Sequence, residues 1–130
     1  MLAEQPKSTK ERLEDAIEET RRVSRCRSVA IARRDGLIIV HRLEPGLDPR
    51  LAAAMAAATL GAADASAKEL RRGKVERVII ECAEGKIVAM DAGPDAIILA
   101  LYDRDANLGL ALHGLARVAH SVDLILTEMR

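Results

Sequence analysis

The stretch LAAAMAAATLGAA, residues 51–63, decides how this chain folds. It lies between Arg50 and Asp64, contains no charged residue, and is small or apolar around the whole circumference of a helix. A helix on the surface of a globular protein normally has a polar side. Asp48-Pro49 supplies an N-cap and a residue suited to the first helical turn, and Gly73 supplies a stop. The pattern predicts a long helix that needs cover on two sides.

We expect one side of this helix to cover a sheet and the opposite side to meet a second copy of the chain. The sheet-facing side is predicted to carry Leu51, Met55, Ala58 and Ala62, and the outer side Ala53, Ala57, Thr59, Leu60 and Gly61. Monomers rarely expose a contiguous apolar strip, and two-fold contacts are the commonest in soluble oligomers. The alternative is that the helix is buried in its own monomer and is rich in alanine because alanine favours helices.

Apolar runs on both sides of the helix predict five strands. Residues 28–32 and 37–40 flank Asp35-Gly36, which is a strong hairpin signal. Residues 75–82, 86–91 and 96–102 are separated by glycine-containing turns and predict a meander. Because residues 96–101 carry no polar side chain, we expect their strand to be central and covered on both faces.

Two further helices are predicted at the ends of the chain. Ser8 and Glu11 match a capping box at the start of a helix over residues 9–25. Asn107 can cap a final helix, whose predicted buried face consists of Leu108, Leu112, Leu115, Ala119, Val122, Leu126 and Met129. Leu110 and Leu124 lie off this face, and we expect the first helix to cover them, with a partner protein as the alternative.

The resulting element order is helix, strand, strand, helix, strand, strand, strand, helix. This order predicts a mixed α/β domain of three layers, in which two covering layers enclose the sheet. A length of 130 residues with 49% hydrophobic side chains suits one core. We expect residues 1–8 to form a tail and residues 9–130 a single domain.

The composition argues against several classes of partner. The 20 basic and 20 acidic side chains cancel, and Tyr102 is the single aromatic residue, so nucleic-acid binding is not expected. Cys26 and Cys82 form no disulfide or metal pattern and are expected to be buried thiols in a reducing compartment. No signal-peptide pattern occurs at the N-terminus, and the longest uncharged run is shorter than the roughly 20 residues that span a bilayer. We therefore expect a cytoplasmic protein without membrane insertion.

No set of residues predicts catalysis or a cofactor. The sequence lacks the glycine-rich motifs that bind nucleoside triphosphates and dinucleotides. His113 and His120 share a helix face near Asp123, and we interpret them as solvated rather than as metal ligands. His41 lacks a predicted nucleophile or paired carboxylate nearby. We expect no metal and no enzymatic activity of the chain's own.

Four arginines have structural interpretations. Arg33 and Arg34 lie at a predicted hairpin tip, where solvated charges are common, and the alternative is an arginine that reaches a transferring phosphate on a partner. Arg71 and Arg72 end the alanine-rich helix, where positive charge is favoured by the helix dipole.

Four segments together resemble the Roadblock family, the dynein-light-chain-like domains. They are AIARRDGLII at residues 30–39, the stretch at residues 51–63, VIIECAEGKI at residues 78–87 and DANLGL at residues 105–110. The resemblance spans residues 9–127 and rests on the order and spacing of the segments. It implies a profilin-like three-layer fold of the α+β type: a five-stranded antiparallel sheet with the second helix on one face and the terminal helices on the other.

The resemblance also implies a mode of assembly and a partner. Family members dimerise through the second helix and the third strand, which here places Arg77, Ile79 and Glu81 at the junction of two sheets. The complete predicted interface is Leu51, Ala53, Met55, Ala57, Leu60, Gly61, Asp64, Arg77, Ile79 and Glu81. The implied function is a homodimeric regulator or scaffold that binds a small Ras-like GTPase, with Arg50, Asp64 and Lys68 as rim contacts.

Two alternatives lack a GTPase partner. One is a ligand-sensing module with a small-molecule pocket between the sheet and the terminal helices. The other is a cytoskeletal or motor adaptor, which the resemblance also implies.

Overall fold

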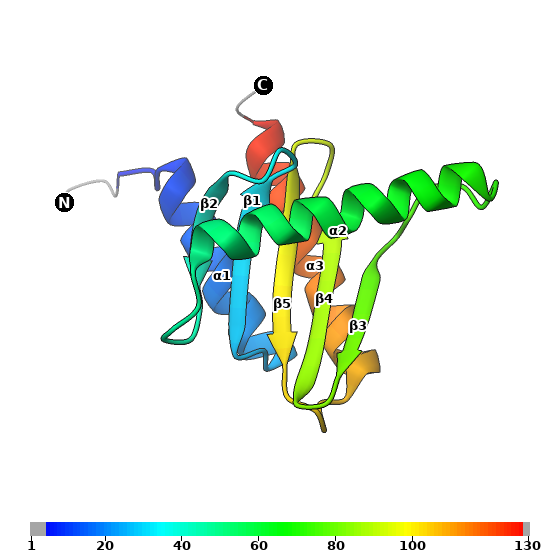
Figure 1. Ribbon diagram of the computed structural model, residues 1–130. Coiled ribbons are helices and arrows are strands. Elements are labelled where there is room, and N and C mark those ends of the chain that lie inside the picture. Colours follow the sequence, from blue (N-terminus) through cyan, green and yellow to red (C-terminus); the bar gives the residue numbers. More distant parts are fainter. Residues whose placement is uncertain (1–4, 129–130) are drawn as a thin grey trace.

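A single antiparallel sheet organises the computed structural model, which describes residues 5–128 (Figure 1). Its strands are β1 (Ser28–Arg33), β2 (Ile38–Arg42), β3 (Val78–Cys82), β4 (Gly85–Asp91) and β5 (Ala96–Tyr102). Their order across the sheet is β2-β1-β5-β4-β3, so β5 is central, as predicted, and β2 and β3 form the edges. The predicted α+β class is confirmed. Residues 1–4 of the predicted tail, and Met129, lie outside the described residues.

Side-chain caps begin the three helices where the sequence predicts them. The helices are α1 (Thr9–Ser24), α2 (Pro49–Glu69) and α3 (Leu108–Thr127). The side chains of Ser8, Asp48 and Asn107 accept hydrogen bonds from backbone N–H groups two or three residues further on, over 3.0–3.1 Å. Each cap satisfies an amide that has no partner within its helix.

Helices α1 and α3 pack together on one face of the sheet and close it with large side chains (Figure 1). Leu13 and Ile17 of α1 and Leu115 and Val122 of α3 are fully buried. The helices approach closely at Gly114, where an added Cβ would lie 2.9 Å from Cγ1 of Val23. This layer contains most of the hydrophobic core.

Helix α2 covers the opposite face, and its orientation is the reverse of the predicted one. Ala53 and Leu60, predicted on the outer side, are buried against the sheet, whereas Leu51 and Met55, predicted to face the sheet, are 57% and 60% exposed. Ala58 and Ala62 are also exposed. Small side chains at the contact let the helix lie close to the sheet, and the larger ones turn outward. The predicted inward side was therefore wrong.

The C-terminal part of α2 projects past the sheet. The helix crosses the strands and continues beyond β3, the edge strand (Figure 1). It ends at Glu69, close to the predicted end, and Leu70, which follows, is 67% exposed. The chain then returns to the sheet, so β3 begins at Val78, whereas the sequence predicted a start at Val75. The overhanging turns have no sheet of their own chain beneath them.

Three other predictions about burial require correction. Leu110 and Leu124 are 69% and 52% exposed, so α1 does not cover them as predicted. Cys26 is buried as predicted, but Cys82 is exposed at the end of β3, beside the turn that leads to β4.

Candidate partner-binding surface

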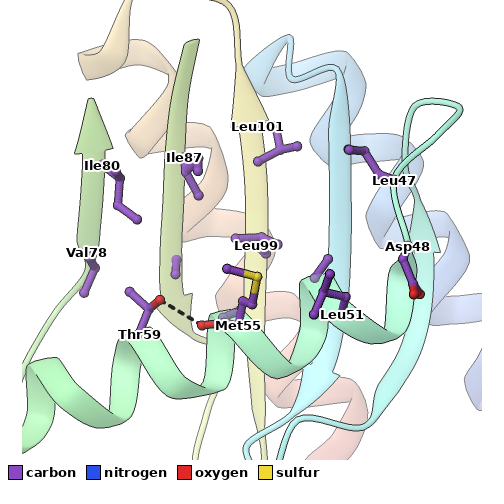
Figure 2. Close-up of a pocket in the computed structure, with 13 residues that line it drawn as sticks. Leu47, Asp48, Leu51, Met55, Thr59, Val78, Ile80, Ile87, Leu99 and Leu101 are labelled. Atoms are coloured by element: carbon purple, nitrogen blue, oxygen red, sulfur yellow. Dashed lines mark hydrogen bonds between the residues drawn. The ribbon is translucent and has the colours of Figure 1, made fainter. Parts of the chain in front are cut away.

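An apolar groove of about 290 Å³ lies between α2 and the sheet (Figure 2). Leu51, Met55 and Thr59 of α2 form one wall. The floor and the other walls include Leu47, Val78, Ile80, Ile87, Ala89, Leu99 and Leu101. Leu99 and Leu101 of the central strand are only half-buried, so β5 is fully covered on one face alone. The ligand-sensing alternative placed a pocket under the terminal helices, whereas this groove lies on the opposite face.

The groove opens toward an unpaired strand edge. The outer side of β3 has no neighbour in the sheet. Ile79 and Ile80 in the middle of this strand are 37% and 38% exposed. An exposed apolar edge presents free backbone groups to any other strand, and folded proteins normally cover or interrupt such an edge. Edge and groove together form one continuous surface without cover.

The residues of α2 separate into two exposed sides by helical periodicity. Successive residues rotate by about 100°. The groove side carries Met55, which lines the groove, and Ala62 two turns further on. The other side faces the β1–β2 hairpin, because an added Cβ at Gly36 would lie 3.3 Å from Cα of Ala54. Arg50, Gly61 and Lys68 follow this hairpin side and are all exposed. The predicted interface residues of α2 are thus divided among its sides: Leu51 and Met55 lie on the groove side, Ala53 and Leu60 are buried, and Gly61 shares the hairpin side with the predicted rim residues.

Arg34 ties the hairpin to both α2 and β4. Its guanidinium donates to the Asp64 carboxylate over 3.1 Å and also pairs with Asp91, which is 14% exposed and has Lys74 at 4.0 Å. Asp64, a predicted interface and rim residue, is therefore engaged within its own chain. Arg33 pairs with Asp35 over 2.7 Å. Both hairpin arginines are exposed, in line with their interpretation as solvated charges, and both pair with carboxylates of their own chain.

The remaining candidates for chemistry are dispersed. His113 and His120 are exposed on α3, and His41 is half-buried on β2. Among residues 5–128, no three His, Cys, Asp or Glu side chains are grouped to hold a metal ion. Burial raises the pKa of the Cys26 thiol above its ordinary value. Burial also raises the pKa of Tyr102 to about 12. Both groups belong to the packed core beneath α1 and α3.

These features define a profilin-like α+β fold. The model of the Roadblock/LC7 domain matches residues 12–102. The chain belongs to the Roadblock/LC7 family. Of the helices within residues 5–128, none combines the length and the apolar character needed to cross a bilayer.

Known relatives agree with this assignment. The uncharacterized protein MJ1340 of Methanocaldococcus jannaschii is 38% identical over 89 residues, which cover 68% of this chain and 77% of the relative. Myxococcus xanthus MglB superposes with a TM-score of 0.88 at 14% identity, and the superposition covers 99% of this chain and 97% of the MglB chain. An MglB with a tetrameric arrangement gives a TM-score of 0.84 at 22% identity, covering 95% and 94%. At these identities the MglB structures show a shared fold.

Sequence reasoning missed the groove itself. Leu51 and Met55 were predicted, but they were expected to be buried against the sheet rather than exposed. Ile80, Ile87, Leu99 and Leu101 were not predicted to be part of a surface. A usable signal was present, because Val78 and Ile80 alternate with Ile79 on an edge strand and make both of its faces apolar.

Proposed function

We propose that this protein is a homodimeric Roadblock-type regulator or scaffold that binds a small Ras-like GTPase. The observation that carries the proposal is the continuous uncovered surface formed by the groove, the free edge of β3 and the overhanging end of α2. Membership of the Roadblock/LC7 family supports it. The proposal places the protein in the cytoplasm, with residues 9–130 as one domain.

A second copy placed across the free edge of β3 covers all three parts of this surface. A two-fold axis there joins the two sheets and sets the second α2 antiparallel to the first, over the groove. Leu51, Met55 and Thr59 then face the partner helix, and the overhanging turns reach the partner's sheet. Burying apolar surface contributes about 25 cal/mol per Å², so removing these exposed leucine and methionine side chains from water favours association.

The hairpin side of α2 stays free in this arrangement and is the proposed docking surface for the GTPase. Arg50 and Lys68 lie 18 residues apart, which corresponds to about 27 Å along one helix. Gly61 lies between them on the same side of the helix. Basic charges of this kind accelerate encounter with an acidic partner surface.

Single-turnover GTP hydrolysis tests the regulatory function. A small Ras-like GTPase is loaded with GTP, and hydrolysis is followed with and without this protein, together with a pull-down in the GDP and GTP states. Binding with faster hydrolysis indicates an activator, and binding without acceleration indicates a scaffold. Failure to bind in either nucleotide state contradicts the GTPase part of the proposal.

Two arginine substitutions on α2 test the dimer. Met55→Arg places a charge in the groove and is expected to give a monomer by light scattering. Gly61→Arg is the matched control, since Gly61 follows the hairpin side of α2 by helical periodicity. Beyond its own helical turns, no described atom lies within 4 Å of an added Cβ there. This variant is expected to stay dimeric but to lose GTPase binding. A wild-type protein that is monomeric at all concentrations contradicts the dimer and leaves the groove as a site for a small apolar ligand.

A further inference from the structure

The two faces of β3 carry different side chains. Val78 and Ile80 line the groove beneath α2. Arg77, immediately before the strand, lies on the other face, in a depression that also includes Ala119 of α3. Ile79 shares that face, because it pairs with Val88 of the terminal-helix core. Glu81, two residues further along the strand, also lies on that face.

The backbone of β3 determines which residues can pair across the free edge. Ala83 and Glu84 form a two-residue turn, and Cys82 pairs with Gly85 beside it. Such a hairpin closes on a hydrogen-bonded pair, after which hydrogen-bonded and non-bonded pairs alternate along the ladder. Cys82, Ile80 and Val78 therefore direct their backbone groups toward β4. The backbone groups of Ile79 and Glu81 point to the free edge.

This alternation restricts the register in which two identical edges can pair. Directly opposite residues in an antiparallel ladder are either both hydrogen-bonded or both not. A residue whose backbone groups point to the free edge must therefore lie opposite another such residue of the second copy. Because such residues occur at every second position, the two-fold axis passes through a residue and not between two neighbouring residues. The axis lies at Val78, Ile79 or Ile80 if the middle of the strand is to be paired.

Side-chain chemistry distinguishes these three registers. An axis at Ile80 sets Glu81 opposite Ile79 of the second copy, and an axis at Val78 sets Arg77 opposite Ile79. Either register leaves a charge against an aliphatic side chain. An axis at Ile79 instead sets Arg77 opposite Glu81 twice, Ile79 opposite itself, and Val78 opposite Ile80 on the groove side. Opposite charges and matched apolar pairs both stabilise neighbouring strands.

We infer that the two-fold axis of the dimer passes through Ile79 and that reciprocal pairs between Arg77 and Glu81 make this edge specific for a second copy of the same chain. The inference rests on the proposed homodimer and names its partner and register. Among the described residues, the one ion pair of Arg77 is an exposed contact with Glu76 at 3.9 Å, so its guanidinium is available. An edge with a different charge order would set like charges opposite each other.

Charge reversal tests the inference. Arg77→Glu and Glu81→Arg each convert two attractive pairs per dimer into two repulsive ones, and each is expected to raise the homodimer dissociation constant at least about tenfold. An equimolar mixture of the two variants restores both attractive pairs and is expected to form the heterodimer. The double variant R77E/E81R is expected to form a homodimer that does not exchange with the wild type. Sedimentation velocity measures the constants, and native mass spectrometry identifies the species.

Matched control variants distinguish an error in the register from an error in the proposed dimer. Arg22→Glu and Glu19→Arg make the same charge changes on the exposed side of α1 and are expected to dimerise as the wild type does. Circular dichroism verifies that each variant folds. A dimeric wild type whose single variants dimerise normally, or whose mixture shows no preference for the heterodimer, overturns the register and leaves the dimer standing. A monomeric wild type overturns the proposed dimer itself.

Discussion

The two faces of the sheet are built from the same strands but packed in opposite ways. Beneath α1 and α3, Ile17, Leu115 and Val122 leave no surface exposed. Beneath α2, Leu60 is the one large side chain of that helix that is fully buried, and the groove stays open. The central strand shows both environments, because Ile98 is fully buried whereas Leu99 lies half-buried in the groove.

Because of this difference, we expect one face of the sheet to stabilise the folded chain and the other to take part in dimer formation. The terminal-helix face removes large apolar side chains from water within one chain, and this burial is the dominant favourable term in folding. The α2 face keeps the helix close to the sheet through alanines and leaves leucine, isoleucine and methionine side chains in contact with solvent. Substitutions on the first face should therefore change the free energy of unfolding, and those on the second the dissociation constant.

The largest effect on the free energy of unfolding is expected on the closed face, which is the face of the sheet covered by α1 and α3. Leu115→Ala removes a fully buried side chain and leaves a cavity, so it is expected to lower the free energy of unfolding by about 2–5 kcal/mol. Met55→Ala, at a position that is 60% exposed, is expected to change it by less than about 0.5 kcal/mol in dilute, monomeric protein. Urea denaturation measures both values. Equal losses would mean that α2 is as tightly integrated into the core as α3.

The second effect concerns a polar group inside the closed face. The Tyr102 hydroxyl is buried without a hydrogen-bond partner among the described residues, and burial raises its pKa from 10.0 to about 12. The unfolded chain ionises first, so the free energy of unfolding is undiminished below pH 10.0 and falls as the pH rises toward 12. The loss is expected to reach roughly 3 kcal/mol.

Tyr102→Phe is the matched variant for this pH dependence. It removes the titrating group, and it also removes a buried hydroxyl without a partner, so it is expected to be neutral or slightly stabilising near pH 7. Its free energy of unfolding should fall less at alkaline pH than that of the wild type. The buried Cys26 thiol, which also titrates at high pH, is present in both proteins and does not account for the difference. Because Tyr102 is the chain's one aromatic residue, tyrosinate absorbance reports its ionisation directly. Ionisation at the ordinary pKa would show that the hydroxyl is solvated.

The third effect compares two helical glycines. At Gly114 an added Cβ would lie 2.9 Å from Cγ1 of Val23 and 3.4 Å from Cβ of Ser24, so Gly114→Leu is expected to cost about 1–3 kcal/mol by separating α1 from α3. Around Gly61 no atom lies within 4 Å of such a Cβ. Gly61→Leu is expected to stabilise the fold by up to about 1 kcal/mol through helix propensity. Thermal unfolding compares the two, and a loss at both positions would show that α2 is already covered at Gly61.

Local chemistry explains what the sequence predicted well. Ser8, Asp48 and Asn107 cap their helices through hydrogen bonds that span two or three residues, and Asp35-Gly36 forms its turn with Gly36 at φ 94°. Such signals do not depend on the rest of the fold. The central position of β5 was predictable for a related reason, because a run without polar side chains favours the middle of a sheet. The predicted cover on both of its faces was wrong, since Leu99 and Leu101 are only half-buried in the groove.

The orientation of α2 was not predictable, because it depends on the partner surface rather than on the helix. A helix of alanines has little contrast between its sides, so the few large residues suggested the inward side. The sheet instead presents Ile97 and Ala89, which leave room at the contact only for Ala53, Ala56 and one leucine. The pairing of Arg34 with Asp64 and Asp91 was missed for the same reason, since it joins residues 30 and 57 positions apart.

The smallest expected effect is on the ionic link between the hairpin and α2. Arg34 and Asp64 are both more than one third exposed, so a double-mutant cycle of Arg34→Gln and Asp64→Asn is expected to give a coupling of about 0.2–1 kcal/mol that weakens in salt. Arg34→Gln should cost more than Asp64→Asn, because Asp91 is 14% exposed and, among the described residues, would retain Lys74 as its one ion-pair partner. Urea denaturation measures the cycle, and hydrogen exchange shows whether the overhanging turns of α2 loosen. If Asp64→Asn proves as costly as Arg34→Gln, the link serves chiefly to hold α2, and the open face is more rigid than its alanines suggest.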